Sequence, residues 1–342
     1  MTSPAPTPLA PAPPDLVLDA ARLARVREGA VVATTAPAIF RVEGPGALTC
    51  LQGLLTNDLA APGDGSLVYG AFLAPKGAIV ADYWVLREAD GFTLVAAPAA
   101  REPTLELFRR TLPPRLARVA DRTGEWRVLW CVGAQGFTSL ARAGLAPLPE
   151  ACARATRVPA GAGDAGDVAL ALGTERAWFA ALAVGAPAAV AAVAGALHHA
   201  GAAAGDADDL EAARILAGWP ALGAEIAERT LPQEVRYDEL GGVSYTKGCY
   251  TGQETVARLH FRGHTNRELR GLRWHGPWRP GADRSVTREG REVGTVRSTV
   301  SAGGSVGLAV LRREVEVGEE VVAAGGPATV VDLPFAPADL EA

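Results

Sequence analysis

The chain has 342 residues, of which 49% are apolar and 21% charged, and its formal net charge at pH 7 is −5. This length exceeds what one core organises and the composition is that of a folded chain, so a short peptide module and a disordered chain are both excluded. The net negative charge offers no overall field for a polyanion. It therefore excludes a general nucleic-acid-coating role and leaves only a local basic patch open.

Hydrophobic periodicity and turn residues predict the elements in chain order. Residues 1–15 hold six prolines and no export signal, and we interpret them as a disordered tail. Strands are expected at 38–42, 66–73, 78–86, 92–96, 126–132 and 168–172, and helices at 47–55, 105–112, 188–204 and 210–217. The segments between 66 and 96 read as an antiparallel meander. Strands and helices mix irregularly, which favours an α+β fold over a doubly wound sheet.

Two further observations concern location. The long uncharged stretch between Arg176 and Asp206 is mostly alanine and is broken by glycine and proline, so it does not predict a membrane span. The four cysteines form no C-x-x-C pair, which indicates neither a disulfide framework nor a zinc finger and fits a reducing cytoplasm. No metal site is predicted.

Only two of the 33 basic residues are lysines, Lys76 and Lys247, and the other 31 are arginines. A bias this strong should have replaced these two as well, unless an ammonium does something that a guanidinium cannot. Both lysines precede glycine. They are the first candidate site residues, with survival on a solvated loop as the alternative, stronger for Lys76 than for Lys247.

The octapeptide KGCYTGQE at 247–254 predicts a glycine loop that enters a helix. A helix N-terminus and the ammonium of Lys247 both favour a thiolate, so Cys249 has a reason to be reactive that the other three cysteines lack. No histidine and carboxylate are spaced for hydrolysis. A mixed set of donors and one carboxylate around this loop instead suits an amide-bearing heterocycle with an acidic tail. This set is Lys247, Gln253, Glu254 and Arg258.

This octapeptide resembles the signature of the YgfZ-type folate-binding proteins, which are related to the aminomethyltransferase (T-protein) of the glycine cleavage system. Weaker motifs follow in the family's order: Leu51-Gln52-Gly53, Thr56-Asn57-Asp58, Pro75-Lys76-Gly77, the set Arg214, Gly218 and Pro220, and Pro232-Gln233-Glu234. The similarity runs from about Phe40 to the C-terminus.

The resemblance implies a T-protein-like fold of interleaved α+β subdomains around a central folate pocket at 16–265, followed by a small β-barrel at 266–342. It implies a tetrahydrofolate-binding accessory factor that supports assembly or repair of iron–sulfur clusters. Its partners would be reduced folate and iron–sulfur client enzymes or cluster assembly proteins, with no nucleic acid and no membrane. Segments 293–300, 306–311 and 319–331, separated by glycine turns, fit the barrel.

The alternative is a true aminomethyltransferase, whose matching turn carries two adjacent acids where Ala81-Asp82 supplies one. Arg236-Tyr237 also departs from the family pattern. The resemblance assigns Cys249 and Lys247 to the reaction. It assigns folate contacts to a larger set: Tyr250, Gln253, Glu254 and Arg258, with Arg214, Asn57 and Lys76 as weaker members.

Overall fold

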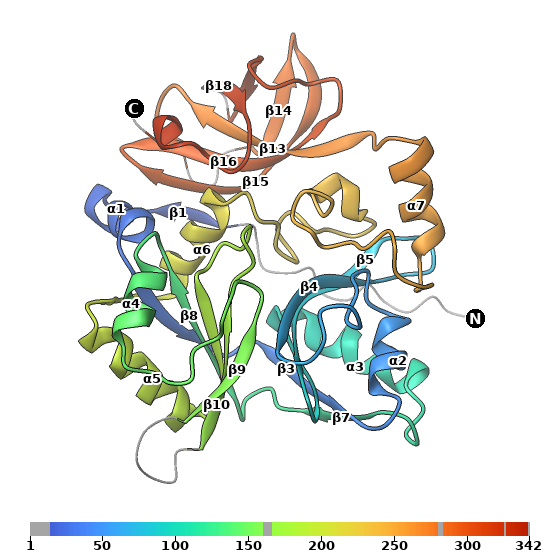
Figure 1. Cartoon of the computed structure of the whole chain (residues 1–342). Coiled ribbons are helices and arrows are strands. Elements are labelled where there is room, and N and C mark those ends of the chain that lie inside the picture. The colour runs from blue at the N-terminus through green and yellow to red at the C-terminus, as the bar shows by residue number, and fades with distance from the viewer. Residues whose placement is uncertain (1–13, 160–165, 280–282, 325, 341–342) are drawn as a thin grey trace.

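The computed structural model describes residues 14–159, 166–279, 283–324 and 326–340. Two sheet subdomains lie side by side and the barrel lies across one end of both (Figure 1). The chain places one strand in the six-stranded sheet, then builds the whole five-stranded sheet, and afterwards returns to complete the six-stranded sheet. The interleaved α+β arrangement that the resemblance implied is confirmed. The predicted tail lies largely outside the described residues.

The five-stranded sheet is antiparallel with the order β4-β5-β6-β3-β7, and β4, β5 and β6 form the predicted meander. Helices α2 and α3 pack on one face, where Leu51 and Phe108 join a core with Phe40 and Phe72. The helix expected at 105–112 begins earlier, directly after the 3-10 turn η1, and the helix expected at 47–55 ends at Gln52. The elements are β3 Ala38–Glu43, α2 Ala47–Gln52, β4 Ser66–Leu73, β5 Ile79–Glu88, β6 Gly91–Ala96, η1 Pro98–Ala100, α3 Arg101–Thr111 and β7 Arg118–Asp121.

The six-stranded sheet has the order β12-β2-β8-β11-β10-β9, and helices α4 and α5 cover its outer face. The helix expected at 188–204 ends at His199, because Gly201 turns the chain with φ +96° and residues 203–204 pair with β2. The elements are β2 Val31–Thr35, β8 Arg127–Val132, α4 Gly136–Arg142, β9 Ala155–Pro159, β10 Asp167–Leu172, β11 Ala181–Gly185, α5 Pro187–His199 and β12 Ala203–Ala204.

The C-terminal strands close into a six-stranded barrel, because β15 pairs with β16 as well as with β14. Strand β1 (Asp15–Val17) adds to the barrel by parallel pairing with β15, so Asp15 begins a strand where the sequence predicts the end of a tail. The barrel strands are β13 Arg267–Trp274, β14 Ser285–Arg288, β15 Arg291–Ala302, β16 Gly304–Arg312, β17 Glu320–Ala323 and β18 Gly326–Val331, and the 3-10 turn η3 Pro337–Leu340 follows.

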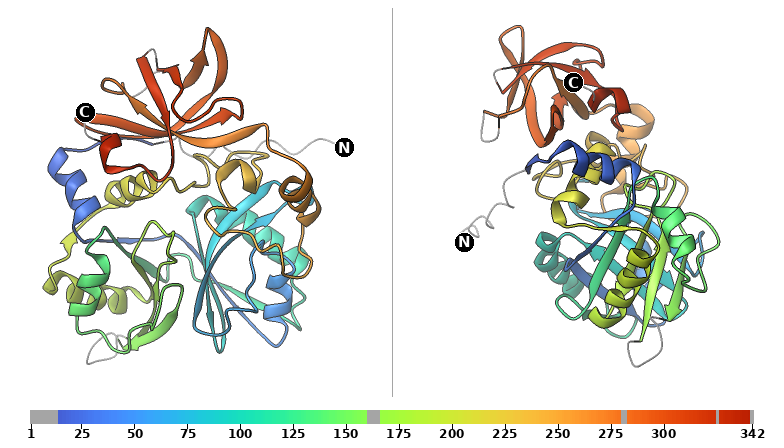
Figure 2. Two further views of the ribbon diagram at one scale, coloured as in Figure 1. Left: turned by 45° about the horizontal axis from the view of Figure 1, so that its top comes forward. Right: turned by 90° about the vertical axis from the view of Figure 1, so that its left-hand side faces the viewer.

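The remaining helices and the segment around η2 lie on the barrel side of the two sheets: in Figure 2, as in Figure 1, α1 and α6 lie by the six-stranded sheet and α7 lies by the five-stranded sheet. Arg236 ties this segment to the barrel end of the chain, with hydrogen bonds to the carbonyl oxygens of Gly218 (3.1 Å) and Leu333 (2.8 Å). These elements are α1 Ala20–Glu28, α6 Ala207–Leu216, η2 Pro232–Val235 and α7 Gln253–Arg262.

Candidate functional site

A cavity lies between the inner faces of the two sheets. Two hollows of about 150 and 350 Å³ share Pro37, Trp130, Trp178 and Arg214, and we call them together the central cavity. The larger one lies within the size range of small-molecule sites. Four tryptophans contribute to the wall of the central cavity: Trp130 and Trp178 line both hollows, and Trp84 and Trp219 line the smaller one. They form two stacked pairs, Trp84 with Trp219 at 5.3 Å between ring centroids and Trp130 with Trp178 at 5.0 Å.

Asp82 supplies a carboxylate to this aromatic wall. It lies on β5, and strand alternation directs it to the same face as Trp84, whereas the neighbouring Ala81 is buried in the core on the opposite face. The hydroxyl of Tyr69 donates a hydrogen bond to Asp82 Oδ2 at 3.1 Å. Burial raises the pKa of Asp82 to about 6, although the Tyr69 hydroxyl and the charge of Arg214 act against the rise.

Arg214, on α6, is the predicted site residue that lines the central cavity. Its side chain is almost fully buried, and its donors are already engaged by this chain. Nε donates to both oxygens of the Glu211 carboxylate, at 2.9 and 3.0 Å. Nη1 donates to Glu225 Oε2 at 2.9 Å and to the carbonyl oxygen of Trp219. Nη2 donates to Glu211 and, at 3.0 Å, to Ser298 Oγ on β15. Arg214 therefore holds α6, the cavity wall and the barrel together.

Several motifs singled out in the sequence meet away from the central cavity, around residues 247–254, which we call the signature loop. Thr251 N donates to the carbonyl of Gly53 at 3.0 Å. A Cβ on Gly252, which has φ +83°, would lie 2.8 Å from the carbonyl oxygen of Ala74 and 3.2 Å from Gly77 Cα. The loop thus rests against the 75–77 turn and the end of α2, and α7 begins at Gln253 as predicted.

Lys247 explains why one lysine survives among the arginines. Its Nζ donates to three backbone carbonyl oxygens, of Gln52 (2.7 Å), Leu55 (2.6 Å) and Asn57 (3.0 Å). A tetrahedral ammonium can donate to three oxygens that converge on one point, and a planar guanidinium cannot. Burial lowers the pKa of Lys247 to about 8, opposed by the charge of Asp58. Lys247 therefore fastens the loop to the segment that follows α2.

Cys249 is exposed two residues further on, at the entrance to α7. The ring of the next residue, Tyr250, is buried and lies 5.1 Å from Lys247 Nζ, and burial raises its pKa to about 12. The loop therefore buries the residues on either side of a glycine–cysteine pair and presents the thiol outward. The sulfur is accessible at the surface and is not sealed in the hydrophobic core.

The other predicted residues lie around this loop. Asn57 is half-buried and bridges the carbonyls of Tyr69 (2.8 Å) and Gly241 (2.7 Å), which gives it a structural contact. Gln253 is half-buried, whereas Glu254, Arg258 and Lys76 are exposed. Of the whole predicted set, only Arg214 lines the central cavity in the part of the chain that the structure describes.

Sequence reasoning missed the aromatic wall and the role of Asp82 as a cavity residue. The available signal was composition, since seven tryptophans exceed the five tyrosines, and Trp219 stands between the motif residues Gly218 and Pro220. The tryptophans and Asp82 come together only because two sheets built from distant segments face each other, and no local sequence pattern encodes that arrangement.

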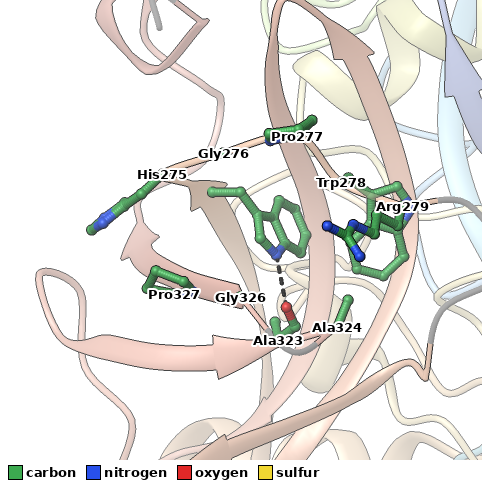
Figure 3. Close-up of a pocket in the computed structure, with 10 residues that line it drawn as sticks. His275, Gly276, Pro277, Trp278, Arg279, Ala323, Ala324, Gly326 and Pro327 are labelled. Atoms are coloured by element: carbon green, nitrogen blue, oxygen red, sulfur yellow. Dashed lines mark hydrogen bonds between the residues drawn. The ribbon is translucent and has the colours of Figure 1, made fainter.

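A further hollow of about 370 Å³ lies at one end of the barrel, lined by residues that include Trp278, Arg279 and Pro327 (Figure 3). It contains none of the predicted site residues. Within the four described ranges, no group of three or more histidine, cysteine, aspartate or glutamate side chains is arranged to hold a metal ion. No described helix is both long and apolar enough to cross a membrane.

Comparison with known proteins places this architecture in a defined class. Residues 20–148 match the family model of the GCVT N-terminal domain, and residues 269–338 match that of the CAF17 C-terminal β-barrel domain. The glycine cleavage system aminomethyltransferase T of Bartonella henselae has the same fold, with a TM-score of 0.75 over 92% of this chain and 89% of that one, at 22% identity. The molecule is thus a T-protein-like fold with a CAF17-type barrel.

Curated relatives identify the family within that class. The chain is 29% identical to the tRNA-modifying protein YgfZ of Cronobacter sakazakii, over 82% of this chain and 84% of the relative. It is 30% identical to the protein of the same name in Shigella boydii, over 68% of each chain. This chain belongs to the YgfZ family, as the signature octapeptide predicted.

Proposed function

We propose that this protein binds tetrahydrofolate in the central cavity and supports iron–sulfur enzymes of the cytoplasm, among them enzymes that modify tRNA, with Cys249 as the key reactive residue. The observation that carries the folate proposal is the cavity itself, where Asp82 stands beside Trp84 in a wall of tryptophans. The tRNA component is supported by the name of the curated relatives, tRNA-modifying protein.

The residues of the cavity fit the pterin ring of a reduced folate. Aromatic planes stack on a flat heterocycle, and a carboxyl group pairs with the adjacent N–H groups of its amide and amine edge. Tyr69 fixes the orientation of Asp82. Because the guanidinium of Arg214 is already engaged by Glu211 and Glu225, its part is to hold the wall. When bound, a reduced folate supplies an oxidisable ring that can carry one-carbon units.

The exposure of Cys249 supports a role at the surface. A thiol on a short loop, anchored by Lys247 on one side and by α7 on the other, can be reached by another protein. We therefore place the encounter with client enzymes or cluster assembly proteins at the signature loop. In this proposal an iron–sulfur cluster is the cargo of those proteins.

The aminomethyltransferase alternative requires two adjacent acidic residues at the positions of Ala81 and Asp82 on β5. Its matching turn carries two adjacent acids, but position 81 is an alanine that is fully buried in the apolar core behind the sheet. Asp82 alone of this pair faces the cavity. We therefore favour the accessory role. An assay for methylene-tetrahydrofolate formation from an aminomethylated carrier protein separates the two, and we expect no formation.

Calorimetric titration with tetrahydrofolate tests the proposal. We expect saturable binding to the wild-type protein and at least tenfold weaker binding to Asp82→Asn, since the carboxyl group would no longer accept two hydrogen bonds. Arg142→Gln, an exposed change on α4, is the matched control and should bind like the wild type. No heat of binding at millimolar tetrahydrofolate, or equal affinity of the wild type and Asp82→Asn, would refute the proposal that tetrahydrofolate binds in the central cavity.

A further inference from the structure

The outward face of α7 combines basic and aromatic side chains. Arg258, Phe261 and Arg262 are spaced three and four residues apart, so they share one face of the helix, and all three are exposed. The opposite face buries Val256. Phe261 is 67% exposed, against 45% for Phe137, the other exposed phenylalanine of the described residues, so its ring offers apolar area that a partner can cover.

The aromatic ring is held in place from behind. His260 stacks on Tyr245 with 3.6 Å between ring centroids, and Phe261 meets the His260 ring edge-on at 4.8 Å. Asp238 accepts hydrogen bonds from both His260, at 3.2 Å, and Tyr245. Phe261 is therefore supported by a rigid pair of rings and leaves its outer surface available for another planar group.

The arginines of this face have no acidic partner among the residues that the structure describes. No acidic side chain of the described ranges forms an ion pair with Arg258 or Arg262. The same holds for Arg313, in the adjoining hollow of about 640 Å³ where α7 passes into the barrel. His264, Arg267 and Arg312 also line this hollow with Glu314 and Glu316; Arg267 pairs with Glu234 at 3.1 Å and Arg312 with Glu314 at 3.7 Å, which leaves Arg313 as its arginine without an ion pair among the described residues. Unpaired arginines thus lie at both the helix face and the hollow.

We infer that the outward face of α7 and the adjoining arginine-lined hollow bind an unpaired segment of RNA, with a base stacked on Phe261 and phosphates held by Arg262 and Arg313. Proteins that bind single-stranded nucleic acids combine exposed aromatic rings, on which bases stack, with arginines that contact the phosphates. A ten-residue helix is about 15 Å long, so RNA on this face lies close to the signature loop. The inference deepens the proposed tRNA-related function and concerns a local surface, since the whole chain carries a charge of −5.

Fluorescence anisotropy with a labelled, unmodified tRNA transcript and the full-length protein tests this inference. We expect Phe261→Ala to weaken binding about 5- to 150-fold, the range found when one stacked base loses its aromatic partner. Arg262→Gln combined with Arg313→Gln should flatten the plot of log affinity against log salt by about 0.7 for each phosphate that the protein no longer neutralises. Arg142→Gln removes an exposed arginine on the distant helix α4 and should change neither quantity.

Binding by the wild type, with weaker binding by these variants and unchanged binding by the control, supports the inference. Equal affinity of all variants, or no binding of the transcript, overturns it. Binding to vesicles of anionic phospholipid without binding to the transcript overturns it as well, because a membrane would then be what covers Phe261. The titration contains neither folate nor client enzyme, so its failure is distinct from a failure of the folate titration.

Discussion

Asp82 makes a quantitative prediction about stability. Burial in the cavity raises its pKa from the ordinary value of 3.8 to about 6. Between these two pH values the folded protein keeps a proton that the unfolded chain has released, so stability falls as the pH rises through this window. Each pH unit of this difference costs about 1.4 kcal/mol. From pH 4.5 to pH 7.5 the expected cost to the wild type is therefore about 2 kcal/mol.

Asp82→Asn removes this titration and keeps an oxygen for the Tyr69 hydroxyl. We expect the variant to gain about 2 kcal/mol over the wild type between pH 4.5 and pH 7.5, or a few degrees in melting temperature. Differential scanning calorimetry at pH 4.5, 6.0 and 7.5 measures the difference. A gain that is the same at every pH, or a loss at pH 7.5, would refute the reasoning.

Asp121 provides the matched control of opposite sign. Burial acts to raise its pKa, but hydrogen bonds from Thr123 and Arg101 outweigh burial and lower it. The folded protein therefore releases this proton before the unfolded chain does, and the contribution of Asp121 to stability is present above the ordinary pKa and lost as the pH falls below it. Asp121→Asn should accordingly destabilise the protein at pH 7.5.

The remaining predictions concern the signature loop. Lys247→Met should lower the free energy of unfolding by about 3 kcal/mol, measured by urea denaturation, and Lys247→Arg should not restore it; a fully stable arginine variant would contradict the carbonyl clamp. Gly252→Ala should cost about 2 kcal/mol and make the loop sensitive to protease, because of φ +83° and the Ala74 carbonyl. Cys249→Ser should keep the wild-type melting temperature and lose the cellular function; a lower melting temperature would indicate a packing role.

Much of the fold could be predicted because local patterns and tertiary contacts agree. The apolar runs of β4, β5 and β6 and the turn residues between them predicted the antiparallel meander nearly residue by residue. Predictions differed at element ends. Residues 200–204 continue the alanine-rich composition of α5, yet the pairing of β12 with β2 takes them into a sheet. The parallel pairing of β1 with β15 joins residues some 280 positions apart, and no local pattern shows it.

The candidate site was predictable in part for the same reason. Loop residues 247–254 are consecutive, so composition and the glycine spacing sufficed to place Cys249 before a helix. The cavity wall is discontinuous in sequence, with Asp82 on β5, Trp130 on β8 and Arg214 on α6. Such a site requires knowledge of how the two sheets face each other.

The most direct test of the account measures modified nucleosides in tRNA by mass spectrometry, in cells that lack this gene and carry the wild type, Asp82→Asn, Cys249→Ser or Arg142→Gln. The account predicts that the wild type and Arg142→Gln restore the products of iron–sulfur tRNA-modifying enzymes. Asp82→Asn and Cys249→Ser, present at normal protein levels, should not. Full restoration by both would contradict the claim that the central cavity and the exposed thiol serve one function.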